Sequence, residues 1–352
     1  MYQIKNINQL NPFLMTLTSA YDHWMYISST GCLTAGRSEA RHSIFPYVTD
    51  DLLHQNSQFT GPVTLVKALL NDKIIIWKPF SNDNQSDKFQ TSLYKDPLGN
   101  QIIFEEINHE LKLKFTYSWQ CSQKFGFIRN SKIENIGLKT TSVKITDGLR
   151  NIMPPGIALR TQQEMSNLAN AYKVSEYIPE SQCALYYLNA LIMDRPEPGE
   201  SLATTLAWSD LDIPFKISLN EKVLDTFFKT GLFNDGHLLK GKSGSFLINF
   251  SLSLNKSESK TWNIVCDTNK SHRTTSKIIK TIKESSNISY LIKDDIEHNH
   301  LKLNHYVNAS DGNQLTNKKV DDMHHRANVL FNIMRGGVFH NNYQIKKSDF
   351  IN

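Results

Sequence analysis

Short runs of alternating hydrophobic and polar residues dominate the chain from about residue 20 to residue 265. Between Leu111 and Tyr117, apolar residues alternate with two lysines and a threonine, which is the pattern of a strand with one buried face. The expected strands cover residues 74–77, 101–105, 111–117, 125–128, 141–145, 202–208, 246–254 and 262–266. No helix-length segments alternate with these strands, so the pattern predicts a mainly β fold, a large antiparallel supersandwich, rather than a parallel α/β fold.

Two helical segments interrupt the strands. Residues 161–172 have apolar residues on one helical face, and Thr161 with Glu164 matches a capping box at the start of a helix. Residues 221–229 form the second expected helix, which Gly231 ends as a C-cap.

Helical patterns take over after about residue 270, in residues 274–285, 288–306 and 319–334. The last of these predicts a buried stripe at helical spacing, made of Met323, Ala327, Leu330, Phe331 and Met334. We therefore expect a β-sandwich domain over residues 1–268 and a helical linker over residues 269–352. Residues 348–352 resemble the first turn of a further helix, and we expect the chain to be cut at a domain boundary there.

The composition is that of a globular protein, with 352 residues, 39% hydrophobic, 21% charged and a net charge of +5. The basic run 270–283 carries isoleucines at helical spacing, which predicts an amphipathic helix rather than a nucleic-acid surface. No apolar stretch is long enough for a membrane span or a secretory signal. The four cysteines are far apart. A reduced cytoplasmic protein with no metal or cofactor, and with neither nucleic acid nor membrane as partner, is expected.

The segment from Gly31 to residue 51 carries the candidate binding groups. Its arginines present planar forks to carboxylates, phosphates or hydroxyls, and its aspartates accept hydrogen bonds from sugar hydroxyls. The candidate substrate-binding residues here are Arg37, Arg41, Tyr47, Asp50 and Asp51. The alternative is a loop at a sheet edge that is stabilised by internal Arg–Asp pairs.

A second candidate, Arg335, precedes two glycines after the last predicted helix. It either contributes to a binding site or belongs to a structural hinge near the negative end of that helix. Histidines gather in residues 298–325, but their spacing does not match a metal site. The tryptophans in the strand runs are expected in the core rather than as sugar platforms; they are Trp77, Trp119, Trp208 and Trp262.

Several motifs together resemble the front part of large bacterial proteins related to cellobiose phosphorylase, inverting glycoside phosphorylases formerly classed as glycosyltransferases. Residues 24–37 and 45–51, WMYISSTGCLTAGR and FPYVTDD, are similar to the opening of these proteins. Residues 125–129 and 147–154 look like their middle strands, and residues 328–337, NVLFNIMRGG, look like their linker.

The resemblance implies a galactose-mutarotase-like sandwich and a helical linker, followed by an (α/α) toroid that holds the catalytic residues, often in a homodimer. It implies phosphorolysis of β-glycosides, with an oligosaccharide as substrate and inorganic phosphate as co-substrate. No catalytic residue is carried over to this chain, whose implied role is to shape the saccharide site and support the toroid. The alternatives are a free-standing carbohydrate-binding or scaffold module, and a glycoside hydrolase with two opposed carboxyl groups in one cleft.

The resemblance generates a first prediction. Because the implied proton donor and phosphate-binding residues lie in the toroid, the purified chain should release no glucose 1-phosphate and no glucose from cellobiose. A coupled enzymatic assay for both products checks this, and measurable release of either one contradicts it.

Overall fold

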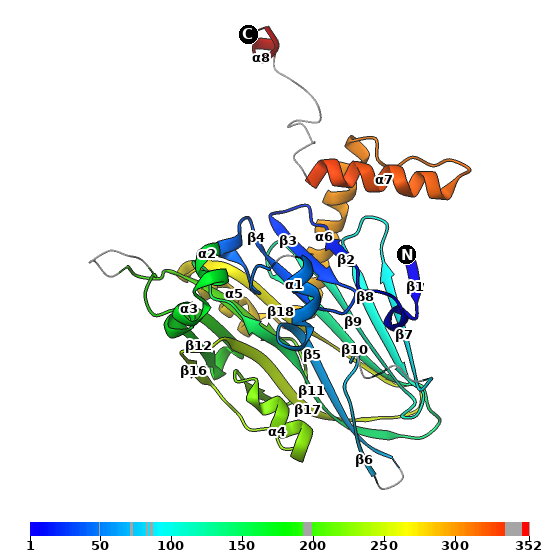
Figure 1. Cartoon of the computed structure of the whole chain (residues 1–352), viewed down its shortest axis with the longest axis vertical. Coiled ribbons are helices and arrows are strands. Elements are labelled where there is room, and N and C mark those ends of the chain that lie inside the picture. Colours follow the sequence, from blue (N-terminus) through cyan, green and yellow to red (C-terminus); the bar gives the residue numbers. More distant parts are fainter. Residues whose placement is uncertain are drawn as a thin grey trace.

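The computed structural model describes residues 1–48, 50–70, 73–81, 84, 87–192, 199–334 and 347–351, and in these residues the strands form three antiparallel sheets (Figure 1). The largest sheet has ten strands in the order β1-β7-β8-β9-β10-β18-β14-β13-β12-β16. Their bounds, in that order, are Tyr2–Lys5, Phe89–Lys95, Ile102–Asn108, Leu113–Ser122, Gly126–Asn135, Ser259–Ser271, Ala203–Ser209, Cys183–Leu188, Lys173–Ile178 and Leu238–Lys240.

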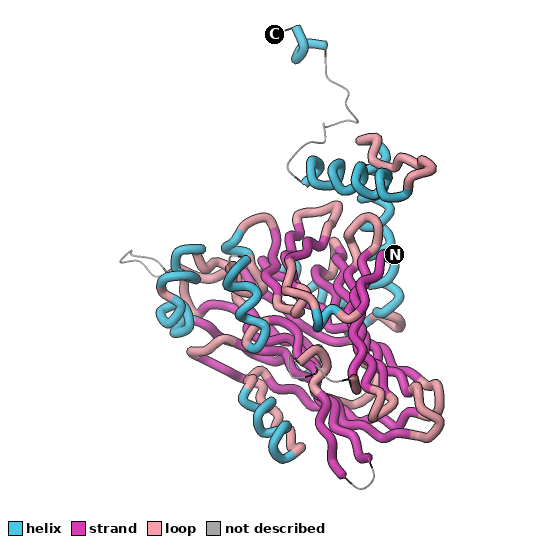
Figure 2. Tube along the Cα trace, turned by 45° about the vertical axis from the view of Figure 1, so that its right-hand side comes forward, coloured by secondary structure: helices cyan, strands magenta, loops and turns pink. Residues whose placement is uncertain are grey.

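A five-stranded sheet packs on the ten-stranded one, and a three-stranded sheet adjoins both (Figure 2). The five strands are β15 (Lys216–Ser218), β17 (Gly244–Leu254), β11 (Thr141–Ile152), β5 (Gly61–Leu70) and β6 (Lys73–Trp77). The three strands are β2 (Leu14–Leu17), β3 (His23–Ser28) and β4 (Leu33–Arg37). The predicted antiparallel β class is confirmed, and every predicted run lies wholly or mostly within one of these strands.

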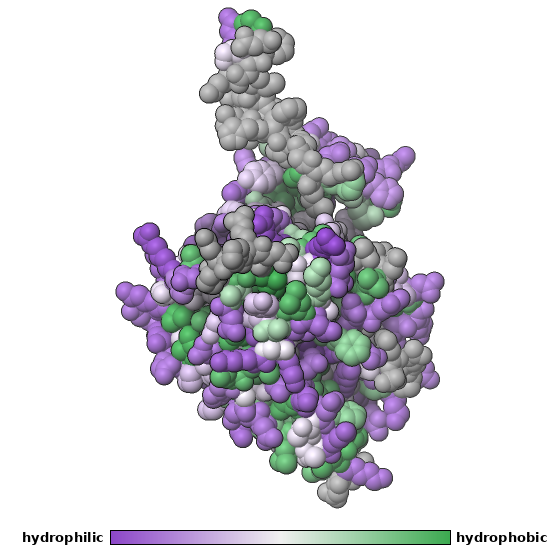
Figure 3. Space-filling model, turned by 60° about the vertical axis from the view of Figure 1, so that its left-hand side comes forward, coloured by the Kyte–Doolittle hydropathy of each residue, from purple (hydrophilic) through white to green (hydrophobic). Residues whose placement is uncertain are grey.

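Helices occupy the ends and the outer face of the sandwich. They are α1 (Asp50–Gln55), α2 (Leu159–Glu164), α3 (Ser166–Tyr172), α4 (Lys222–Thr230), α5 (His272–Glu284), α6 (Ile288–Ala309), α7 (Lys319–Met334) and α8 (Lys347–Ile351). The last strand ends at Ser271 and α5 begins at His272, beside the predicted boundary at 268/269. Hydrophilic side chains predominate on the face shown in Figure 3, with hydrophobic ones between them in small groups.

The core lies between the two large sheets, with a second apolar layer under the C-terminal helices. Trp119 and Trp262 belong to the first layer, whereas Trp208 packs with Ile278 of α5 and Ile292 of α6 on the outer face of the ten-stranded sheet. All four tryptophans of the strand runs are at most 2% exposed, which confirms their predicted place in the core. The C-cap of α4 is confirmed as well, since Gly231 has φ 70° and donates its N–H to the carbonyl of Phe227 at 2.7 Å.

Two helical expectations were wrong in detail. Residues 161–172 form two short helices, α2 and α3, which break at Met165. The capping box is absent, because α2 begins at Leu159 and therefore places Thr161 inside the helix. The carboxylate of Glu164 instead pairs with Arg160 one turn earlier, at 2.7 Å.

The stripe predicted on α7 is mostly not buried. Leu330 is buried against Leu303 and Val307 of α6, but Ala327 is exposed and Phe331 is 54% exposed. The side chain of Met334 lies outside the described part of the chain. The periodicity failed here because α7 lies beyond the end of the sheets and packs on one end of α6, which covers only a narrow part of its surface (Figure 1).

A buried ion pair joins the two large sheets. Arg129 of β10 donates from Nη1 to both carboxylate oxygens of Asp147 on β11, at 2.8 and 2.7 Å, and neither residue is exposed. Thr64 of β5 and Trp262 of β18 donate to the same carboxylate at 2.6 and 2.8 Å. The charge of Asp147 is thus met by donors from both sheets, which is the condition under which a buried carboxylate is tolerated.

The second prediction concerns this pair. Asp147→Asn keeps the shape of the side chain but leaves Arg129 as an uncompensated buried charge, so the free energy of unfolding should fall by about 3–5 kcal/mol. Urea unfolding followed by tryptophan fluorescence measures the change. As a control, Asp212→Asn breaks the exposed pair with Lys260 and should cost at most about 1 kcal/mol. Equal small effects of the two variants contradict the prediction.

Candidate functional site

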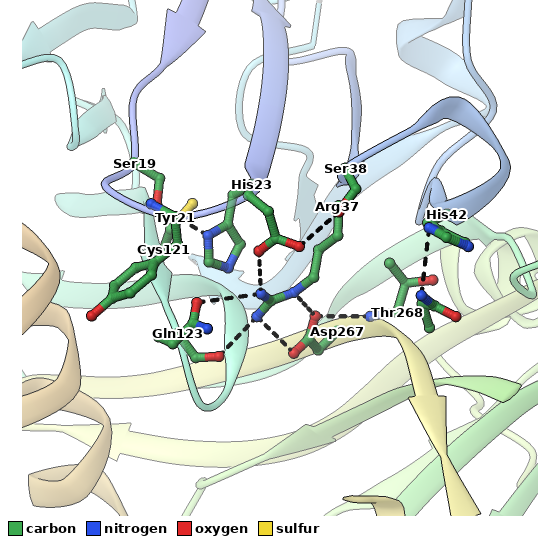
Figure 4. Close-up of polar contacts among 12 residues, drawn as sticks. Ser19, Tyr21, His23, Arg37, Ser38, His42, Cys121, Gln123, Asp267 and Thr268 are labelled. Carbon is green, nitrogen blue, oxygen red and sulfur yellow. Dashed lines mark hydrogen bonds and ion pairs between the residues drawn. The ribbon is translucent and has the colours of Figure 1, made fainter. Parts of the chain in front are cut away.

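Arg37, the first candidate from the sequence, lies inside the protein at the end of β4. Its guanidinium pairs with Asp267 of β18 at 2.7 Å and with Asp22 at 2.7 Å, and it donates to the carbonyl of Gln123 at 2.9 Å (Figure 4). Burial lowers the pKa of Arg37, but the carboxylates of Asp267 and Asp22 together outweigh this effect and raise the pKa above its ordinary value. Arg37 thus has internal Arg–Asp pairs of the kind considered for this loop, with Asp267 and Asp22 as the partners.

The same cluster contains His23, whose Nδ1 lies 3.0 Å from the hydroxyl of Ser19. Burial, with the nearby positive charge of Arg37, lowers the pKa of His23 to about 3. The imidazole is therefore neutral at physiological pH and packs edge-on against the ring of Phe127, with centroids 5.1 Å apart. This region joins the three-stranded sheet to the ten-stranded sheet.

Arg41 and Tyr47 contact other parts of the fold. Arg41 is exposed and pairs with Glu39 at 2.8 Å, a surface contact of small energetic value. Tyr47 is half-buried, and its ring lies edge-on to Trp24 with centroids 5.5 Å apart. Arg37, Arg41 and Tyr47 thus have separate partners rather than a common one.

The remaining predicted site residues are only partly placed. Asp50 and Asp51 begin α1, but their side chains lie outside what the structure describes. Arg335, with the two glycines after it, also lies outside the described residues. Their assignment to substrate binding stays a prediction.

A polar cavity of about 270 Å³ opens between the two large sheets at the end covered by the loop after β3. We call it the inter-sheet pocket. It is lined by Thr30, Gly31, Gln58, Pro62, Val63, Thr64, Lys78, Pro79, Phe80, Ser81, Tyr117, Arg129 and Arg150. Hydroxyl, amide and guanidinium groups thus line a concavity in an otherwise apolar interior, as in sites that orient a small polar ligand.

Two arginines, Arg129 and Arg150, line the pocket. The guanidinium of Arg129 is held by Asp147 and donates from Nη2 to Thr64 at 3.1 Å. Arg150, on β11, is 5% exposed and donates to the backbone carbonyls of Gln58 and Pro62. Burial lowers the pKa of Arg150, which Glu221 partly offsets. Both guanidinium groups are therefore fixed in orientation by the fold.

Tyr117 of β9 faces the pocket from the ten-stranded sheet. The carbon Cζ of Arg129 lies 4.7 Å from the centroid of its ring, and the ring is stacked on Phe104 with centroids 4.8 Å apart. Gly31 lies in front of the hydroxyl: it has φ +85°, and a Cβ at this position would be 2.8 Å from the oxygen. The lack of a side chain at Gly31 therefore lets the backbone pass close to the hydroxyl of Tyr117.

Residues 78–81, which also line the pocket, are anchored by the buried carboxyl group of Glu106. Glu106 of β8 accepts hydrogen bonds from Trp77 Nε1 at 2.6 Å, Phe80 N at 2.8 Å and Asn84 Nδ2 at 2.8 Å. Burial raises the pKa of Glu106 to about 7, although the three hydrogen bonds to its carboxyl group lower the pKa. The position of Phe80 at the pocket thus depends on a carboxyl group that titrates near neutrality.

A groove of about 570 Å³ continues from the pocket toward α4. It shares Gln58, Lys78 and Arg150 with the pocket and adds Glu221, Phe228 and other residues of the helix. A ligand larger than the pocket therefore has a path along the surface between β5 and α4.

Carboxylates collect in another cleft, of about 510 Å³, between α6 and the outer face of the ten-stranded sheet. Asp210 there accepts hydrogen bonds from the backbone and side chain of Asn263 at 2.6 and 2.7 Å and from Ser289 at 2.6 Å. Asp212 pairs with Lys260. Asp210 thus links α6 to the sheet, and the contacts of Asp210 and Asp212 are structural rather than those of an opposed pair for acid–base chemistry.

Two further properties bear on possible partners. Within the described residues, no group of three or more histidine, cysteine, aspartate or glutamate side chains could hold a metal ion. None of the helices in the described ranges is long and apolar enough to cross a membrane.

The inter-sheet pocket was missed by sequence reasoning apart from Gly31. Its residues come from six segments of the chain, and Arg129 and Arg150 lie in apolar strand runs that predict only core positions. The sequence feature that could have indicated the pocket is an arginine inside a strand pattern, because a buried charge needs an internal partner or a ligand.

The comparisons with known proteins give only distant similarity. No protein-family model matches the chain, and no curated protein matches it. A solved structure described as a kojibiose phosphorylase from the human microbiome is 13% identical with a TM-score of 0.37, over 69% of this chain and 27% of that one. A polysaccharide lyase is 11% identical with a TM-score of 0.40, over 77% of this chain and 34% of that one.

An aldose epimerase homologue from C. elegans is 8% identical with a TM-score of 0.40, over 74% of this chain and 100% of that one. The chain thus spans about a third or less of the phosphorylase and the lyase. Similarities at these TM-scores do not establish a shared activity, and membership of the cellobiose phosphorylase family stays a prediction.

The third prediction follows from Glu106. Because its pKa is raised in the folded state, its contribution to stability is fully present below about pH 4.5 and is lost as the pH rises through about 7. A rise in the pKa of Glu106 from 4.5 to about 7 corresponds to roughly 3 kcal/mol in the free energy of unfolding. In urea unfolding between about pH 5 and about pH 8, the wild type should therefore lose stability relative to Glu106→Gln.

The matched control for this titration is Glu110→Gln, which removes an exposed carboxylate paired with Lys88 at 2.9 Å. Its stability relative to the wild type should change little over the same pH range. A difference between the wild type and Glu106→Gln that does not vary with pH contradicts the assignment.

Proposed function

We propose that this chain is the β-sandwich part of a carbohydrate-active enzyme and that its inter-sheet pocket binds a saccharide. The observation that carries the proposal is the polar lining of this pocket within an apolar core. A cavity of about 270 Å³ is slightly below the usual range for ligand sites, roughly 300–1,000 Å³, which suits a single small polar unit. The groove toward α4 offers room for a second unit.

The chemistry of the lining supports a polyhydroxylated ligand. A fixed guanidinium presents several donors in one plane, and hydroxyl and amide groups both donate and accept. Arg150 supplies the guanidinium, and Thr30 and Gln58 supply the hydroxyl and amide groups. Phe80 adds an apolar surface of the kind that packs on the C–H face of a sugar ring.

The proposed role in this pocket is binding rather than bond cleavage. None of the lining residues that the structure describes is an aspartate or glutamate, whereas glycoside cleavage needs a proton donor and a second carboxylate or phosphate. Phosphorolysis, inorganic phosphate as co-substrate, and a homodimer therefore enter only as properties of the larger enzyme that the sequence resemblance implies. A free-standing carbohydrate-binding module would use the same pocket without that enzyme.

The fourth prediction tests the proposal on the isolated chain. Titration with cellobiose by calorimetry should show saturable binding, with a Kd of about 1 mM or below, equivalent to about −4 kcal/mol. Arg150→Lys keeps the positive charge but removes the planar fork, so the Kd should rise about tenfold, or about 1.4 kcal/mol.

The matched control is Arg160→Lys on the exposed surface of α2, which should leave the Kd unchanged. Circular dichroism confirms that both variants are folded. If the wild type and Arg150→Lys bind with equal affinity, the sugar binds outside this pocket. If the wild type binds neither cellobiose, galactose nor kojibiose, the proposed function is rejected.

A further inference from the structure

The ring of Tyr117 is held from several sides within the core. It stacks on Phe104 with an interplanar angle of 11°, meets Phe80 edge-on with centroids 5.2 Å apart, and carries the guanidinium of Arg129 against one face. The residue is 3% exposed. The position of its hydroxyl is therefore set by packing and does not depend on a hydrogen bond.

That hydroxyl has no hydrogen-bonding partner among the residues that the structure describes. Tyr117 nevertheless lines the inter-sheet pocket, where its oxygen faces Gly31. The oxygen does not belong to the fully enclosed polar atoms that lack a partner, so it is open to the pocket, where water or a ligand group can satisfy it. The missing partner of Tyr117 must therefore come from the contents of the pocket.

We infer that Tyr117 is a specificity-determining residue of the inter-sheet pocket and that its phenol recognises a neutral hydroxyl group of the bound saccharide. This inference rests on the proposed function. A phenol offers one donor and acceptor lone pairs, which match the donor and acceptor of an alcohol. Burial raises the pKa of Tyr117 further above its ordinary value, so the group stays protonated and keeps its donor at neutral pH.

Gly31 packs directly beside the phenol oxygen. A side chain at this position would meet the phenol oxygen, and its positive φ also disfavours any residue other than glycine. The approach to the hydroxyl is thus kept free of protein side chains, as a site for a ligand group requires.

The variant Tyr117→Phe tests the inference because it removes the oxygen and retains the ring. The contacts with Phe104, Phe80 and Arg129 remain, so the melting temperature should change by no more than a degree or two. The affinity for cellobiose should fall about 3- to 10-fold in calorimetric titrations, since the ligand hydroxyl loses its partner.

Tyr186→Phe is the matched control. Tyr186 of β13 is 1% exposed, but its hydroxyl donates to the carbonyl of Ser245 at 2.9 Å. Removal of this oxygen leaves a buried carbonyl without its donor, so the melting temperature should fall while the affinity for cellobiose stays the same. The two variants are thus expected to show opposite effects on stability and binding.

The outcomes separate the inference from the proposed function. If the wild type binds cellobiose and Tyr117→Phe binds it equally well, the inference is overturned and the proposed function stands. If Tyr117→Phe loses thermal stability as Tyr186→Phe does, the hydroxyl has an internal structural role, which also overturns the inference. If the wild type binds neither cellobiose, galactose nor kojibiose, both fail.

Monodeoxy derivatives of methyl β-glucoside identify the hydroxyl that is recognised. The derivative that lacks this group should bind the wild type and Tyr117→Phe alike, whereas the others should retain the difference between the two proteins. If the wild type binds every derivative more tightly than Tyr117→Phe does, recognition of a single hydroxyl is ruled out.

Discussion

The pairing of Arg129 with Asp147 is the constraint on which the interior of this protein depends. It links a strand of the ten-stranded sheet to a strand of the five-stranded sheet, and both charges are out of contact with water. Arg37 and Asp267 form a comparable link between the three-stranded sheet and the ten-stranded one. Such pairs add little net stability over apolar packing, but they penalise any register that separates the charges. We interpret them as devices that fix how the three sheets meet.

The same polar centre accounts for the pocket beside it. Because Asp147 holds Arg129 and Thr64 in place, the apolar side chains of the two sheets do not close over this end of the core. Gly31 contributes by leaving room before Tyr117, and Arg150 by holding the backbone at Gln58 and Pro62. The inter-sheet pocket is thus a direct result of placing charged groups between sheets.

Local patterns were sufficient for the fold class and insufficient for the site. Alternation over a few residues identified the strands and placed Trp119 and Trp262 in the core, since both depend on neighbours in sequence. Arg37, by contrast, finds its partner Asp267 230 positions away, which no local pattern indicates. The stripe on α7 failed for a related reason: periodicity shows which face is apolar, but the amount of burial depends on what that face packs against.

The place of β18 in the ten-stranded sheet has a consequence for how the protein forms. This strand is the last of the sheet in sequence, yet it lies between β10 and β14 and joins the two halves of the sheet. Residues 127–134 pair with the nearby strand β9 on one side, but on the other side they find their partners only when residues 259–266 are available, well over a hundred positions later. Loop closure of this length slows folding and leaves strand edges open in the meantime. During synthesis, the facing edges of β10 and β14 therefore lack their common partner until β18 has left the ribosome.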